Sequence, residues 1–120
     1  MTRAAVLSFA VAVVAAAPLA AQEIYQAVVL ELAVPEVHVI VARAHGDERV
    51  QCLLRDTTGR IRIAGTQPIS TGLASGGTTI LTIPLPLLDP GETEFAVTLL
   101  RGSTEIHRTE WRPLFRTSAR

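Results

Sequence analysis

The stretch Asp89–Trp111, DPGETEFAVTLLRGSTEIHRTEW, decides the fold that the sequence predicts. Within it, the segment 95–100 (FAVTLL) places Phe, Val and Leu at every second position, which is the period of a strand with one buried face. Asp89-Pro90-Gly91 forms a predicted entry turn, because proline presets one φ angle and glycine tolerates a positive one. Arg101–Thr104 (RGST) then reverses the chain. The stretch therefore predicts a turn followed by a β-hairpin.

The register of this hairpin stays open at the level of sequence. A loop of three residues places Phe95 opposite Trp111, whereas a loop of two residues places Leu99 opposite Ile106. A slip of one residue exchanges the two faces of a strand, so the choice decides which side chains are buried.

The rest of the chain continues the same pattern of short strands and turns. The first predicted strand is an edge strand, for which a helix over 24–33 stays open, and the second has apolar residues on both faces, as in the middle of a sheet. The segment 66–77 is a predicted crossing loop. The pattern predicts an antiparallel β-sandwich of about seven strands, of immunoglobulin or fibronectin type III kind. Besides the hairpin, the predicted strands are 23–34, 36–44, 49–55, 60–63 and 78–83.

The segment Leu87–Phe95 resembles the corner of fibronectin type III domains, in which a leucine and a Pro-Gly pair precede an aromatic residue. Phe95 stands where those domains usually have tyrosine, so the hydroxyl hydrogen bond of that corner would be absent. The resemblance concerns the fold and implies nothing about function.

The chain begins with a predicted secretory signal peptide. Arg3 gives a positive start, the segment 4–17 is apolar and rich in alanine, and Pro18–Ala21 ends in small residues. We place cleavage after Ala21, with Ala20 as the alternative, and expect no membrane span in the processed protein. The predicted organisation is a leader at 1–21, a β-sandwich at 22–112 and a flexible tail at 113–120, in a periplasmic or secreted protein.

Composition excludes some classes of partner. Eleven arginines balance eleven acidic residues, and this charge balance argues against nucleic acid as the main partner. We expect the protein to be a monomer. The single cysteine, Cys52, cannot form an internal disulfide and lies in an apolar strand pattern. We therefore predict that it is a small buried apolar residue rather than a reactive thiol.

No pattern in the sequence indicates catalysis. His38, His45 and His107 lie on separate predicted segments without the short spacing of metal ligands. No serine lies in a G-x-S-x-G motif, and the glycine-rich segment 74–77 is followed by neither lysine nor a predicted helix. We therefore predict no catalytic, cofactor-binding or metal-binding residues, and a protein that is not an enzyme.

From Cys52 onward the chain resembles the curli-associated periplasmic chaperones or inhibitors. The resemblance lies in the order of a strand, Thr58-Gly59, the short strand Ile61–Ala64, a loop containing Gln67, the segment Gly76-Gly77-Thr78 and the strand Glu94–Leu100. It implies a non-catalytic secreted sandwich that transiently binds another protein, an amyloid fibre subunit, and keeps it soluble.

The predicted partner-binding residues are Arg60, Ile61, Arg62 and Ile63, in a short strand at the border of a sheet. We expect its isoleucines to face the core and its arginines to face water, so that the main chain pairs with an incoming strand while the arginines block further stacking. The alternative is a structural or adhesive immunoglobulin-like module of an envelope assembly. A binder of small ligands would need a convergent polar pocket, which the pattern does not indicate.

Overall fold

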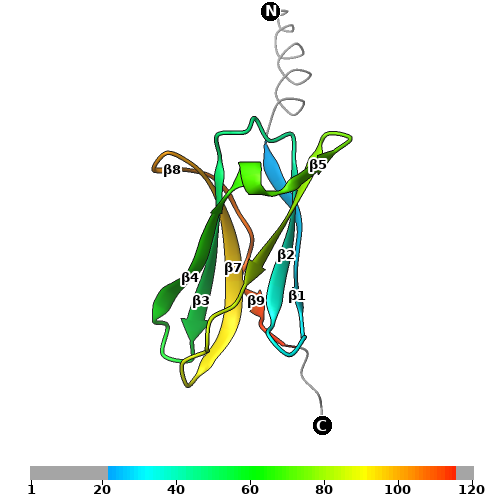
Figure 1. Cartoon of the computed structure of the whole chain (residues 1–120). Helices are drawn as coiled ribbons and strands as arrows, with labels where there is room; N and C mark the ends of the chain where they lie inside the picture. Colours follow the sequence, from blue (N-terminus) through cyan, green and yellow to red (C-terminus); the bar gives the residue numbers. More distant parts are fainter. Residues whose placement is uncertain (1–21, 116–120) are drawn as a thin grey trace, which may run out of the picture.

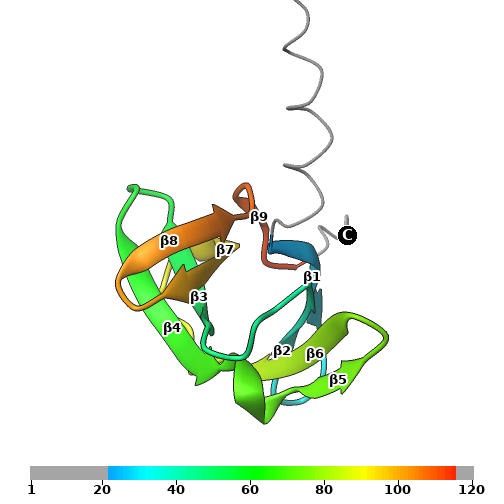
Figure 2. The ribbon, with the colours of Figure 1, turned by 90° about the horizontal axis from the view of Figure 1, so that it is seen from above.

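The computed structural model describes residues 22–115, so the predicted leader and the segment 116–120 lie outside the described residues. Two antiparallel sheets pack face to face, and the prediction of an all-β antiparallel sandwich is confirmed (Figures 1 and 2). Within 22–115, no helix has the length and apolar character needed to cross a bilayer.

The first sheet has four strands, in the order β1-β2-β6-β5. The second has five, in the order β4-β3-β7-β8, with β9 paired to β7 beside β8. A 3-10 turn, η1 (Ile69–Thr71), leads from β4 in the second sheet to β5 in the first (Figure 1). The strands are β1 (Glu23–Leu30), β2 (Glu36–Ala42), β3 (Arg49–Asp56), β4 (Ile61–Pro68), β5 (Leu73–Ser75), β6 (Thr78–Pro84), β7 (Glu92–Arg101), β8 (Thr104–Arg108) and β9 (Arg112–Pro113).

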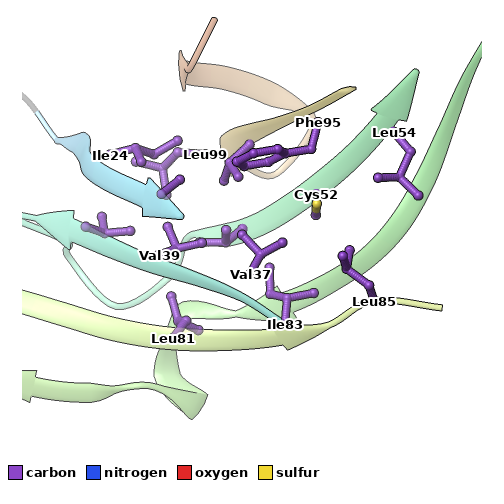
Figure 3. Close-up of a cluster of buried hydrophobic side chains, with 14 of the residues drawn as sticks. Ile24, Val37, Val39, Cys52, Leu54, Leu81, Ile83, Leu85, Phe95 and Leu99 are labelled. Carbon is purple, nitrogen blue, oxygen red and sulfur yellow. The ribbon is translucent and has the colours of Figure 1, made fainter. Parts of the chain in front are cut away.

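The core lies between the sheets and is built from alternate residues of the strands (Figure 3). Phe95, Val97 and Leu99 of β7 point into it, as the two-residue period predicts. Cys52 of β3 is fully buried among these side chains, which confirms its predicted environment. Aromatic residues are few, so the core consists mainly of aliphatic side chains. The other members of the cluster are Ile24, Ala27, Val37, Val39, Val41, Val50, Leu54, Ile69, Leu81, Ile83, Leu85 and Leu114.

The positions of the first two strands agree with the sequence. Segment 23–30 forms the edge strand β1, so the helical alternative is wrong. Strand β2 lies between β1 and β6, which explains why it carries apolar residues on both faces.

The final hairpin combines features of both open alternatives. Its turn has two residues, because Arg101 pairs with Thr104, and Gly102 supplies the positive φ of 62°. A bulge then shifts the register by one residue, so that Leu99 lies opposite His107 rather than Ile106. Neither predicted register is therefore correct over the whole hairpin, since a bulge inserts one unpaired residue.

Two predicted boundaries need correction. The expected loop 66–77 instead continues β4 to Pro68 and contains η1 and β5. At the carboxyl end, Pro113 pairs with Glu94, and the N–H of Leu114 donates to the carbonyl of Thr93 at 2.8 Å. Because Leu114 is also buried, the packed domain extends past the predicted boundary at 112.

Candidate partner-binding edge

Strand β4 forms one border of the second sheet, and β3 is its only strand partner within residues 22–115. Ile61 and Ile63 project outward, with 52% and 57% of their surface exposed. Arg62 lies opposite the fully buried Leu54 of β3 and therefore faces the inner side of the sheet. The prediction that the isoleucines face the core and the arginines face water is wrong for these three residues.

The inward position of Arg62 is explained by the acidic residues that surround it. Its Nε and Nη2 atoms donate to the two carboxylate oxygens of Glu92 at 2.9 and 2.8 Å. Nη2 also donates to the carbonyl of Leu87 at 3.1 Å, and Asp89 lies 3.4 Å from Nε. The hydrogen bonds from Arg62 lower the pKa of Glu92 despite its burial. Arg62 therefore holds the β6–β7 connection against β4.

No signal in the sequence predicts this orientation, because an R-I-R-I alternation is compatible with either side chain facing the core. Strand β4 has a bulge at Ala64, because Cys52 pairs with Gly65 but Leu53 pairs with Ile63. This bulge decides which face of the sheet each of the preceding residues points to. Arg60 precedes the strand, and its side chain is exposed.

On the outer face, β4 borders a row of apolar residues. Ile63 lies opposite Leu53, and Leu53 lies opposite Ala96 of β7. Leu53 and Ala96 are buried although they face away from the core between the sheets. Beside this row, the guanidinium of Arg55 lies 4.3 Å from the centre of the Trp111 ring and 2.7 Å from Glu94. An apolar side chain placed next to Ile63 would continue the row.

The other sheet borders offer less main chain. On β1, the N–H of Ile24 donates to Nδ1 of His107 at 3.1 Å, and Nη1 of Arg112 donates to the carbonyl of Ala27 at 3.1 Å. Both side chains belong to the second sheet, and each is hydrogen-bonded to a main-chain group of β1 that an added strand would otherwise use. Strand β5 has three residues and β8 has five, whereas β4 has eight.

The one group of three metal-ligand side chains found within residues 22–115 is His45, Asp47 and Glu48, whose ligand atoms lie within 4.8 Å of one another. The guanidinium of Arg101 binds all three: Nη2 contacts Nδ1 of His45 at 2.9 Å and Glu48 at 3.0 Å, and Nε contacts Asp47 at 3.2 Å. An arginine thus occupies the position that a cation would take.

Glu48 follows a turn, where a carboxylate is usually solvated, yet it is 1% exposed. Burial by itself raises the pKa of its carboxyl group, but hydrogen bonds from the N–H groups of His45 and Gly46 outweigh that effect and lower the pKa. The carboxylate therefore organises the β2–β3 turn and fixes Arg101.

An apolar hollow of about 410 Å³ lies at the end of the sandwich, between the β1–β2 turn (Ala33, Val34, Pro35) and the segment Leu85–Leu88. Its lining carries no charged or hydrogen-bonding side chain. It lacks the convergent polar groups that orient a small ligand.

Comparison of the chain with protein-family models, with curated proteins and with solved structures finds no significant match in any of the three.

Proposed function

We propose that this protein is a non-enzymatic, exported binder of extended polypeptide segments, which uses the outer border of β4 to keep curli-type amyloid subunits soluble. The observation that supports it best is the border at Ile61–Ile63, where no strand within residues 22–115 pairs with the outer side of β4 and two large apolar side chains are more than half exposed.

The physical basis is the addition of a strand to a sheet. An incoming extended segment pairs with main-chain groups of β4, and its side chains cover Ile61 and Ile63. The bulge at Ala64 interrupts the regular ladder, so the pairing surface is short. A short surface favours weak, reversible binding, which suits a protein that holds a subunit and then releases it.

Two further features support this role. The resemblance of the region from Cys52 onward to the curli-associated chaperones or inhibitors points to the same class of partner. The predicted signal peptide would place the protein in the periplasm, where such subunits pass.

The test is the growth of fibres by a curli-type subunit, followed with thioflavin. The wild-type protein should lengthen the lag time, whereas the double variant Ile61→Lys/Ile63→Lys should not, because the charges oppose burial of the added strand. Both residues are exposed, so the fold should persist, as circular dichroism would check. Leu73→Lys, at a residue that is 76% exposed on β5, is the matched control and should act as wild type. A double variant as active as wild type would refute the proposal.

A second candidate is the structural or adhesive module. It is favoured by the outer face of the first sheet, where Ile80 lies opposite both Ile40 and Leu73. Ile80 and Leu73 are 42% and 76% exposed, which is unusual for a row of large apolar residues. This candidate predicts a stable co-purifying envelope protein that Leu73→Lys releases, and no effect on the lag time of fibre growth.

A further inference from the structure

We infer that the segment bound at β4 has the pattern apolar-polar-apolar, and that its central residue is uncharged or basic but not acidic. The inference rests on the proposed function, and it specifies the chemistry of the partner at that border.

The pattern follows from how side chains alternate across a strand pair. Residues directly opposite each other on neighbouring strands project to the same face of the sheet, whether the pairing is parallel or antiparallel in sense. The partner residues opposite Ile61 and Ile63 therefore project outward. The residue opposite Arg62 projects to the inner side.

The outward positions call for apolar residues. Beside Ile63 the row continues through Leu53 to Ala96, both of them buried. Ile61 lines a hollow of about 430 Å³ together with Arg55 and Glu94, and those two side chains are already paired with each other. An apolar partner residue at either position removes exposed isoleucine surface from water without leaving a charge unpaired.

The central position lies beside a cluster of charges on the inner side. Arg62 faces Glu92 and Asp89, while Asp56 is paired in register with Glu92. The N–H of Arg60 donates to Asp56, and the positive charge of the Arg60 side chain helps to lower the pKa of that carboxyl group. Two arginines and three carboxylates leave the cluster with one net negative charge.

Within this cluster Asp89 is the carboxylate most accessible to a partner, because Asp56 is half-buried and already accepts hydrogen bonds from Thr58 and from the N–H of Arg60. The side chain of Asp89 is 55% exposed, whereas that of Glu92 is 4% exposed and is bound by Arg62. An amide or an ammonium group on the central partner residue can donate to Asp89. A carboxylate there would meet like charge, which selects against an acidic residue.

The test uses blocked nine-residue peptides with the central sequences Val-Gln-Val, Val-Lys-Val, Val-Glu-Val and Gln-Val-Gln, with binding followed by fluorescence anisotropy at low salt. We expect Val-Gln-Val and Val-Lys-Val to bind, and Val-Glu-Val to bind about fivefold more weakly than Val-Lys-Val. The out-of-phase peptide Gln-Val-Gln should bind weakest. The ratio of the affinities for Val-Lys-Val and Val-Glu-Val should fall towards one in about 0.5 M salt, because salt screens interactions between exposed charges.

The variant Asp89→Asn should remove the discrimination between the Lys and Glu peptides. Asp47→Asn is the matched control, because Asp47 is also an exposed carboxylate paired with an arginine, but near the opposite end of the sandwich. It should leave the ratio unchanged.

The outcomes separate the inference from the proposed function. If Ile61→Lys/Ile63→Lys abolishes binding but all four peptides bind equally to the wild type, the inference fails and the binding border stands. If no peptide binds, or the double variant binds as tightly as wild type, the proposed function itself fails.

Discussion

Arg62 and Glu92 form a two-point ion pair, Nε to Oε2 at 2.9 Å and Nη2 to Oε1 at 2.8 Å, that joins two strands which are not neighbours. Strand β3 lies between them, so the pair crosses the inner side of the sheet. Oε1 of Glu92 also accepts the N–H of Asp89 at 2.7 Å, which closes the turn that precedes β7.

Removal of Arg62 should destabilise the domain strongly. In Arg62→Ala, the carboxylate of Glu92 keeps its buried position but loses its main donors. We expect a clear fall in the free energy of unfolding, measured by urea denaturation, because the carboxylate is left without its charged partner. The neighbouring, exposed Arg60→Ala should change it by less than about 0.5 kcal/mol. Equal effects of the two substitutions would contradict a structural role for Arg62.

Stability should fall at acid pH because of Glu48 and Glu92. Both carboxyl groups have a pKa below the ordinary value in the folded state, so they bind fewer protons when folded than when unfolded. Their contribution is complete above the unfolded pKa of about 4.3 and is lost as the pH falls through the lower folded value.

The variant Glu92→Gln tests this pH dependence. It should be less stable than wild type at pH 7, yet its free energy of unfolding should fall less steeply from about pH 5 to about pH 3. Glu110→Gln, at an exposed position, should keep the wild-type slope. Identical slopes for Glu92→Gln and wild type would show that Glu92 is not a source of the acid sensitivity.

Thr98 offers a substitution that should stabilise the protein. Its side chain is 2% exposed, and its Oγ1 forms no hydrogen bond with any residue in the range 22–115. Thr98→Val replaces the hydroxyl with a methyl group of similar size and should raise the free energy of unfolding by about 1 kcal/mol. Thr98→Ser keeps the hydroxyl and should give no gain. A loss of stability in Thr98→Val would reveal a partner for the hydroxyl in solution.

Cys52 should be inert in the folded protein. Burial raises the pKa of its thiol to about 12, and the thiolate is the reactive form. Alkylation by iodoacetamide at neutral pH should therefore follow unfolding in urea, as mass spectrometry would show. Ser103→Cys, in the exposed turn between β7 and β8, should be alkylated without denaturant. Rapid alkylation of native Cys52 would mean that the core opens readily.

The border strand shows how far the sequence could predict the candidate site. The short segment 60–63, in which arginine alternates with isoleucine, predicted that β4 lies at the border of a sheet. The exposed isoleucines lie within this segment. The inward orientation of the Arg62 side chain could not be predicted from the sequence, because it depends on Glu92, which lies 30 residues further along the chain. The burial of Glu48 does not follow from the sequence for the same reason, because its partner Arg101 belongs to a different strand.

By itself, the sequence determined the class of fold. Alternation of apolar residues with a period of two is a local property, and segments such as FAVTLL at 95–100 carry it without reference to the rest of the chain. Tertiary structure decided the phase of β4, the register after the bulge in the last hairpin and the packing of Leu114. Each of these depends on main-chain or charged groups that are distant in sequence and meet only when the two sheets close.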